Sequence, residues 1–282
     1  MVTRILTGEP PRLKAPAGTT DTHMHFYDSR YATIPGTPQP ADASVEDYRQ
    51  VMKWLGIERT VIVQPNAYGD DNRLTMDCVA ALGQDIARAV CVVKPGVPEA
   101  ELDALTKAGA RGARIMALLG GTVGLDQLDA VAAKIHAFGW HPIVQLDGRN
   151  LPGHEEQLKS LPGNFVIDHV GKFTQPVTTD DPAFKSLLRL LETGRCYIKI
   201  AAIYETSQVG APSYSDVGAL AKALIAHAPD RTLWASNWPH AQAAKFGYPD
   251  DAAMFDLLLD WAGDETTIRK MLVDNPARLY GF

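Results

Sequence analysis

Short apolar segments recur along the whole chain and alternate with segments of helical character. Eight of them read as buried strands, and they cover residues 19–26, 60–65, 89–94, 112–116, 142–147, 165–170, 196–201 and 232–237. Eight buried strands that alternate with helices and have short connections favour a (β/α)8 barrel over a doubly wound sheet. The predicted fold class is therefore α/β, a single TIM-type barrel.

The segments between these runs carry helix signals. Ser44, with Asp47 three residues later, is a plausible N-cap, and Gly56 and Gly139 stand where helices end. We expect helices at 44–55, 125–138 and 215–228. The first 18 residues are rich in proline and form an N-terminal arm, and no shift in composition marks a second domain. We therefore expect residues 1–282 to form one domain.

Composition argues against several classes of partner. The 282 residues suit one α/β barrel, and a net charge of −6 without a basic block argues against nucleic acid. No apolar run approaches the ~18 residues of a membrane span, and the N-terminus lacks the apolar core of a signal peptide. Cys78, Cys91 and Cys196 lack C-x-x-C spacing, which fits buried thiols in a reducing compartment. We expect a soluble cytoplasmic protein, whose oligomeric state stays open.

Two histidines, His23 and His25, stand at the end of the first predicted strand. Side chains two residues apart on a strand share a face, so the two imidazoles should project together. Paired imidazoles bind a metal, or exchange protons with a substrate oxygen near neutral pH. The pair by itself leaves a surface or core role open.

Other polar residues stand at the ends of the later predicted strands. In a (β/α)8 barrel the chemistry takes place at this C-terminal end of the strands. Such a ring of polar groups on strands rich in Val, Ile and Leu indicates a functional site. Its members are Gln64, Asn66, Lys94, Arg114, Gln145, Asp147, Asp168, His169, Lys199, Tyr204, Asn237 and His240.

Several of these motifs together resemble the amidohydrolase superfamily, and within it the amidohydrolase 2 branch. They are Asp21-Thr-His-Met-His25, Asp168-His169, Trp234-x-x-Asn237-Trp-Pro-His240 and the ending Asp274–Phe282. The similarity spans nearly the whole chain. The branch includes lactonases that act on 2-pyrone-4,6-dicarboxylate and on sugar lactones. The resemblance therefore implies a barrel enzyme that acts on a small anionic lactone.

Two departures from the family pattern bear on the mechanism. Metal-dependent members add a bridging carboxylated Lys or Glu on the fourth strand and a last-strand Asp that activates water. Here the fourth strand carries Arg114 and Met116, and the last-strand position is Asn237, which is no base near pH 7. We therefore expect no metal cofactor. One zinc ion on His23, His25 and His169 is the alternative that the ligand count allows.

The missing carboxylate matters less if water is not the nucleophile. A six-membered 1,5-lactone of a sugar diacid carries a hydroxyl that can attack its own carbonyl and give the 1,4-lactone. Such an intramolecular nucleophile has an effective molarity of ~10⁵–10⁸ M, so modest acid–base help suffices. The expected function is the isomerisation of a sugar-diacid lactone, of the type that converts a galactaro-1,5-lactone into the 1,4-lactone. The alternatives are hydrolysis of a carboxylate-bearing lactone, with or without zinc, and a non-catalytic binder.

Catalytic roles follow from this chemistry. His169, beside Asp168 in sequence, is the first choice for proton transfer with the attacking hydroxyl. His23 and His25 would polarise the lactone carbonyl and stabilise its oxyanion. Asn237 would hydrogen-bond and orient the reacting hydroxyl.

Substrate binding calls for a cation and several hydrogen-bonding groups. Arg114 is the best candidate for the free carboxylate, because its planar fork matches a carboxylate, although a structural salt bridge is as good an explanation. Lys199 and Lys172 are second choices. Candidates that would read sugar hydroxyls are Gln145, Asp147, Asn66, Tyr204 and His240.

Overall fold

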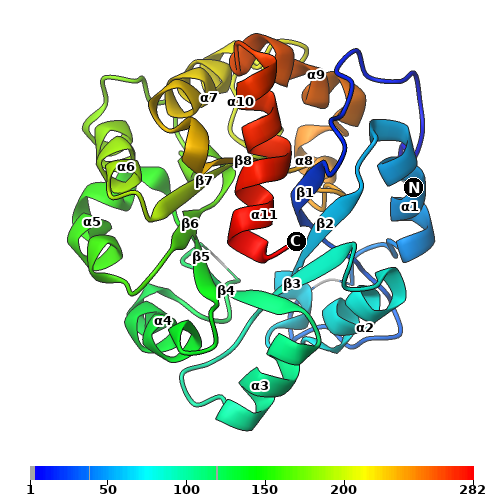
Figure 1. Ribbon diagram of the computed structural model, residues 1–282, viewed down its shortest axis with the longest axis vertical. Coiled ribbons are helices and arrows are strands. Elements are labelled where there is room, and N and C mark those ends of the chain that lie inside the picture. Colours follow the sequence, from blue (N-terminus) through cyan, green and yellow to red (C-terminus); the bar gives the residue numbers. More distant parts are fainter. Residues whose placement is uncertain (1–3, 38, 119) are drawn as a thin grey trace.

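Eight parallel strands form one ring-shaped sheet with helices around it (Figure 1). The computed structural model describes residues 4–37, 39–118 and 120–282. The strands follow one another around the ring in chain order. They are β1 (Thr20–Met24), β2 (Arg59–Val63), β3 (Ala87–Cys91), β4 (Ala110–Met116), β5 (His141–Gln145), β6 (Phe165–Ile167), β7 (Cys196–Ile200) and β8 (Thr232–Trp234).

The ring closes between β8 and β1. The Thr22 hydroxyl donates to the Trp234 carbonyl at 2.8 Å, and the Asn237 amide donates to the His23 carbonyl at 2.9 Å. All eight predicted strands are present, and the predicted (β/α)8 barrel is confirmed.

The helices surround the ring of strands, apart from α11 (Asn275–Tyr280), which lies across one end of it (Figure 1). They are α1 (Val45–Leu55), α2 (Arg73–Leu82), α3 (Glu99–Lys107), α4 (Leu128–His136), α5 (Leu151–Ser160), α6 (Pro182–Glu192), α7 (Ser215–His227), α8 (Ala243–Phe246), α9 (Asp251–Trp261), α10 (Glu265–Arg269) and α11 (Asn275–Tyr280). None of the helices in the described ranges has the length and apolar character to cross a membrane.

The predicted ends of α1 are confirmed. Ser44 and Asp47 form a reciprocal capping box, in which each side chain accepts a hydrogen bond from the other residue's backbone amide. Gly56 ends the helix in the left-handed conformation, with φ 75°. The arm before β1 packs alongside this helix, where the Trp54 indole donates to the Glu9 carbonyl at 2.8 Å.

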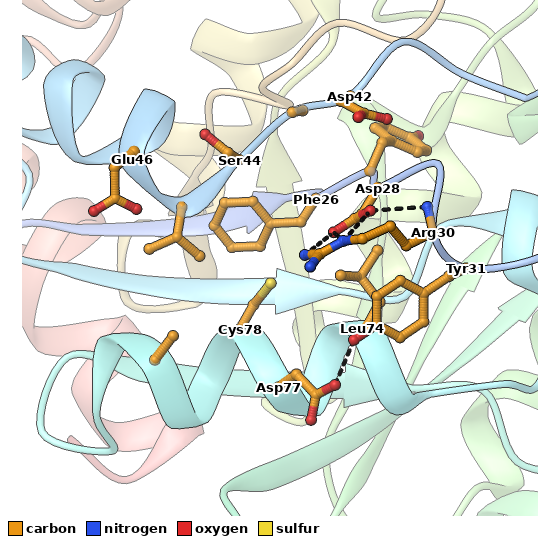
Figure 2. A pocket seen from close by; sticks show the side chains of 14 residues that line it. Phe26, Asp28, Arg30, Tyr31, Asp42, Ser44, Glu46, Leu74, Asp77 and Cys78 are labelled. Atoms are coloured by element: carbon orange, nitrogen blue, oxygen red, sulfur yellow. Dashed lines mark hydrogen bonds and ion pairs between the residues drawn. The ribbon is translucent and has the colours of Figure 1, made fainter.

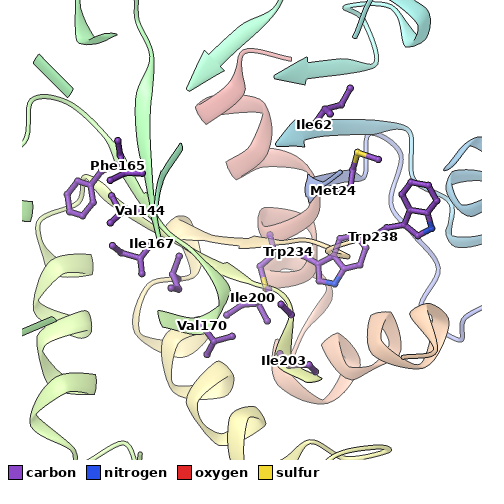
Figure 3. Close-up of a cluster of buried hydrophobic side chains, with 14 of the residues drawn as sticks. Met24, Ile62, Val144, Phe165, Ile167, Val170, Ile200, Ile203, Trp234 and Trp238 are labelled. Carbon is purple, nitrogen blue, oxygen red and sulfur yellow. The ribbon is translucent and has the colours of Figure 1, made fainter. Parts of the chain in front are cut away.

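Alternate residues of β2, β3 and β5–β8 enter two different cores. Val166 of β6 points into the barrel with Val61, Ile143 and Leu233, while its neighbours Phe165 and Ile167 belong to the outer cluster beneath the helices. Figure 3 shows part of this outer cluster, including Ile167, Ile200 and Trp234. α11 lies across one end of the barrel in Figure 1, where its Tyr280 completes the inner core.

The barrel interior becomes polar toward the ends of the strands. Gln145 lies two residues beyond the inner Ile143, and Lys199 lies two beyond the inner Tyr197. Residues two apart share a face, so both side chains follow the apolar plug into the same interior. Arg114 of β4 is buried with them. This polar layer is the floor of the candidate site.

The three cysteines are buried thiols, as predicted. Cys78, Cys91 and Cys196 are free. Burial raises the pKa of the Cys78 and Cys91 thiols to about 12, so both stay protonated at neutral pH.

Candidate active site

His23 and His25 converge inside the barrel, as their spacing predicts. The Nδ1 atom of His25 lies 2.7 Å from the Val63 carbonyl oxygen, so Nδ1 carries the hydrogen and Nε2 of the neutral ring carries the lone pair. That Nε2 lies 3.2 Å from Nε2 of His23. A hydrogen bond at this contact therefore requires the hydrogen to be on His23 Nε2.

Lys199 completes this chain of donors and acceptors. Its ammonium nitrogen lies 3.3 Å from His23 Nδ1, the nitrogen that is left with a lone pair. It also lies 3.6 Å from Asp168 Oδ1, and both of these side chains are fully buried. Lys199 thus donates to His23, His23 donates to His25, and His25 donates to the backbone. Sequence reasoning ranked Lys199 only second, although its alternation with Tyr197 was a usable signal.

Asp168 contacts His23 and not its neighbour His169. Its Oδ1 lies 3.3 Å from His23 Nδ1. Because the backbone at Asp168 is extended, with φ −83° and ψ 155°, adjacent side chains point in different directions. The neighbours Asp168 and His169 in the sequence therefore do not form an ion pair with each other, and the Asp168 carboxylate lies against His23.

Burial keeps the site imidazoles neutral. Burial, followed by the positive charge of Lys199, holds the pKa of His23 well below 6.5. Burial and the charge of Arg114 lower the pKa of His25 to about 3. Burial also lowers the pKa of Lys199, to about 8, so its ammonium form persists at pH 7.

His169 occupies a strained turn after β6. His169 and the following Val170 have φ 52° and 56°, values that are unusual for residues with a side chain and a genuine outlier for β-branched valine. The turn brings the His169 ring within 4.7 Å of the His23 ring. Its Nδ1 is buried without a hydrogen-bond partner in the part of the chain that the structure describes. Burial holds its pKa well below 6.5, so the ring is neutral at pH 7 and one of its nitrogens carries a lone pair.

Arg114 presents a buried guanidinium without a carboxylate partner. It donates through Nη1 to the Gln64 carbonyl at 2.9 Å and through Nη2 to Gln145 Oε1 at 3.1 Å. Its Nε–H is buried and has no partner among the described residues, and none of them forms an ion pair with Arg114. An ordinary barrel salt bridge is therefore not the explanation for this arginine. Gln145 orients the guanidinium.

Asn237 and Tyr204 form a second cluster at the ends of β7 and β8. Asn237 Nδ2 donates to the Tyr204 hydroxyl at 2.9 Å and to Glu205 Oε1 at 3.2 Å. Because a carboxylate only accepts, this contact fixes the orientation of the amide. Asn237 Oδ1 has no hydrogen bond among the described residues. Glu205, which sequence reasoning missed, also pairs with Lys172.

His240 has both ring nitrogens engaged. Nε2 lies 3.0 Å and 3.1 Å from the two carboxylate oxygens of Asp251, and Nδ1 lies 3.2 Å from the Tyr204 hydroxyl. All three side chains are buried. Asp251 begins α9 and carries no sequence signal that would connect it to His240.

Two predicted substrate contacts are engaged elsewhere. The Asp147 carboxylate accepts from Arg149 and from the Thr174 hydroxyl, at 2.6 Å and 2.5 Å. The Asn66 amide contacts the Met116 sulfur. Neither side chain contacts the histidines.

The residues present do not suit a divalent metal while Lys199 is charged. His23, Asp168 and His169 each offer one ligand atom, and these atoms lie within 4.8 Å of one another. The predicted zinc ligands were His23, His25 and His169, and in the observed group Asp168 stands in place of His25. However, the Lys199 ammonium lies within this group and uses the His23 lone pair that a metal would need. A dication would have to displace this buried positive charge.

A separate pocket of about 490 Å³ lies outside the barrel, between the loop after β1, the start of α1, and α2 (Figure 2). Its acidic groups are largely engaged by the protein. Arg30 pairs with Asp28, and the Tyr31 hydroxyl donates to Asp77 at 2.5 Å. These charges are satisfied locally, whereas the guanidinium of Arg114 is not.

The fold and the polar strand ends define a barrel enzyme of the amidohydrolase type. A family described as Amidohydrolase matches residues 20–282, and the chain belongs to it.

Curated relatives match along almost the whole chain. A D-galactarolactone isomerase of Agrobacterium fabrum is 42% identical over 98% of this chain and 96% of its own length. A 2-pyrone-4,6-dicarboxylate hydrolase of Comamonas testosteroni is 32% identical over 96% of this chain and 92% of its own length. The apo crystal structure of an Agrobacterium tumefaciens protein superposes with a TM-score of 0.93, at 41% identity and with 99% of both chains covered.

Proposed function

We propose that this enzyme isomerises the lactone of a sugar diacid, of the galactaro-1,5-lactone to 1,4-lactone type. The observation that carries the substrate class is the buried Arg114 guanidinium, which lacks a carboxylate partner among the described residues. A substrate carboxylate would supply the missing charge in a bidentate pair. The similarity to a D-galactarolactone isomerase at 42% identity supports the same reaction.

The reaction is an intramolecular acyl transfer. The hydroxyl oxygen on C4 attacks the lactone carbonyl carbon, and the bond from that carbon to the ring oxygen on C5 then breaks. One proton leaves the attacking oxygen and one reaches the departing oxygen. His169, neutral and with a free Nδ1, takes the proton from the attacking hydroxyl. Asn237 Oδ1 accepts a hydrogen bond from that hydroxyl and orients it.

Of the two paired histidines, His23 polarises the carbonyl, because His25 uses its N–H on the Val63 carbonyl and offers only the lone pair of Nε2. The His23 Nε2–H donates to His25 in the absence of ligand and is the group offered to a lactone oxygen. Lys199 behind it donates to Nδ1 of the same ring, and this positive charge makes His23 the stronger donor. Lys199 thereby supplies a fixed positive charge next to the reacting carbonyl.

We propose that turnover needs no metal, because the Lys199 ammonium already occupies the His23 lone pair. Activity should survive exhaustive chelation and gain nothing from added zinc. Metal analysis of protein purified without chelators provides the control. A stoichiometric zinc ion whose removal abolishes turnover would contradict this assignment.

Hydrolysis is the competing function, because a 2-pyrone-4,6-dicarboxylate hydrolase is among the relatives. The two reactions are separated by following a 1,5-lactone by NMR in water enriched in ¹⁸O. Isomerisation yields the 1,4-lactone without solvent oxygen, whereas hydrolysis yields the open diacid with one solvent oxygen. Accumulation of the open diacid as the first product would favour the hydrolase.

A further inference from the structure

The Tyr204 hydroxyl is connected to a buried carboxylate through His240. Asp251 contacts His240 Nε2 at 3.0 Å and 3.1 Å, and His240 Nδ1 lies 3.2 Å from the Tyr204 hydroxyl. A carboxylate on one imidazole nitrogen fixes the ring and stabilises its protonated form. Because both nitrogens are engaged, His240 cannot itself contact a ligand and can act only through Tyr204.

The proposed reaction requires a proton donor that His169 does not provide. His169 is neutral and serves as the acceptor for the attacking hydroxyl, whereas the departing ring oxygen is a poor leaving group until it is protonated. Lys199 is committed to His23 and Asp168. Within the described ranges, Tyr204 is the remaining proton donor that contacts Asn237, the residue proposed to orient the substrate.

We propose that Tyr204 is the catalytic acid for the departing ring oxygen, and that His240 and Asp251 are positioning residues that resupply its proton. This inference rests on the proposed function. When His240 is protonated, its Nδ1–H donates to the Tyr204 oxygen, and the phenolic hydrogen is free to point toward the ligand.

The proton transfers balance in this scheme. As the carbon–oxygen ring bond breaks, the phenolic hydrogen moves to the ring oxygen and the Nδ1 hydrogen of His240 moves to Tyr204. His169 has gained the proton of the attacking hydroxyl, and His240 has lost one. Exchange with water returns both rings to their starting states. In the reverse reaction, Tyr204 accepts the proton and His169 donates it.

Asn237 adds a feature specific to an amide at this position. Its Nδ2–H donates to the Tyr204 oxygen, which stabilises negative charge there while the proton departs. An aspartate would accept from Tyr204 instead and would turn the phenolic proton away from the ligand. The Asn237 amide therefore suits Tyr204 to act as an acid.

The experiment compares two substrates that differ only in the leaving group. One is the 1,5-lactone. The other is a 4-nitrophenyl ester with the same attacking hydroxyl and free carboxylate, whose 4-nitrophenolate departs without protonation. The variants are Tyr204→Phe, Asp251→Asn and His169→Asn. Tyr248→Phe is the matched control, because it removes only a hydroxyl that donates to the Pro239 carbonyl at 2.8 Å and keeps the ring that packs edge-on against His240, with centroids 5.7 Å apart.

We expect Tyr204→Phe to lower kcat on the lactone by ~10²–10⁴-fold, with KM little changed, because general acid catalysis contributes about this factor. Asp251→Asn should also lower it. Both variants should turn over the ester, after subtraction of its uncatalysed rate, at close to the parent rate. His169→Asn should lose both reactions, and Tyr248→Phe should keep both.

Equal losses on lactone and ester in Tyr204→Phe would overturn the proposal, because a merely structural tyrosine affects both. Unchanged isomerisation in Tyr204→Phe would overturn it as well. If the parent enzyme forms only open diacid, the proposed function fails. The same comparison of leaving groups then tests Tyr204 on the hydrolysis.

Discussion

Among single residues, Arg114 has the environment that most needs a ligand. Two of its five N–H groups bind protein acceptors, and the buried Nε–H has no partner among the described residues. A buried charge without a counter-ion is costly, so a site that keeps one must recover the cost when an anion binds. The histidines beside it stay neutral and add no competing charge.

Arg114→Lys should weaken binding of a carboxylate-bearing lactone by about 1.5–3 kcal/mol, because the positive charge remains but the planar fork is lost. Neutral lactones should be little affected. The measurement is the dissociation constant of each lactone type by calorimetry. Arg111→Lys is the matched control on the same strand, since Arg111 donates to the Thr106 and Ala110 carbonyls. Equal losses on both lactone types would make Arg114 structural.

Asn237→Asp keeps the shape of the side chain but replaces a donor by a carboxylate. The new carboxylate would lie beside Glu205 and would accept the Tyr204 proton. We expect isomerisation to weaken, zinc affinity to rise and a hydrolytic side reaction to appear. The mass of the product distinguishes hydrolysis from isomerisation, because hydrolysis adds one water and isomerisation adds none. A variant that isomerises as well as the parent and does not hydrolyse would remove Asn237 from the reacting centre.

At the level of elements, α11 closes the end of the barrel opposite the site. Tyr280 packs edge-to-face against His141 at the start of β5, with ring centroids 5.1 Å apart, and belongs to the inner core. Its hydroxyl is buried and without a partner among the described residues. The ring stabilises the barrel by packing, while the hydroxyl contributes a desolvation cost.

Tyr280→Phe should therefore raise the free energy of unfolding by ~1–3 kcal/mol, the cost of a buried unpaired hydroxyl. Tyr280→Ala should lower it by ~3–5 kcal/mol, because it leaves a cavity beneath the polar layer. Urea denaturation of both variants checks these values. A loss of stability in Tyr280→Phe would mean that the hydroxyl binds an ordered water.

For the whole molecule, the number of buried neutral imidazoles determines how stability depends on pH. Burial lowers the pKa of His23 and His169 well below 6.5, and that of His25 and His141 to about 3. Below pH 6.5 these histidines take up protons in the unfolded chain but not in the folded one. The free energy of unfolding therefore falls as the pH falls through this window.

The contribution of each such histidine should be about 1.4 kcal/mol per pH unit below 6.5. His141→Gln should make the fall in unfolding free energy between pH 6.5 and 4 shallower by about this slope, with little effect on activity at pH 7. The half-exposed His154 gives the control for the substitution itself, His154→Gln. Urea denaturation at each pH provides the measurement. An unaltered slope in His141→Gln would show that this ring titrates normally.

Local patterns made the fold predictable. Burial imposes apolar runs and the alternation of two faces on each strand, so the strands, the α1 cap at Ser44 and the convergence of His23 with His25 follow from nearby residues. The polar strand ends also follow, because a barrel collects them at one end. The sequence by itself therefore determined the architecture and most of the residues that line the candidate site, and its resemblance to the amidohydrolase superfamily indicated the class of enzyme.

Only the tertiary structure decided which of these residues act together. Asp168 contacts His23 across the barrel instead of His169 beside it, and His240 contacts Asp251 on α9. Lys199 reaches His23 from β7, while Arg114 is left without a carboxylate among the described residues. Such contacts depend on strand register, ring closure and the directions of individual side chains. No local periodicity encodes them, because the partners lie far apart in the chain.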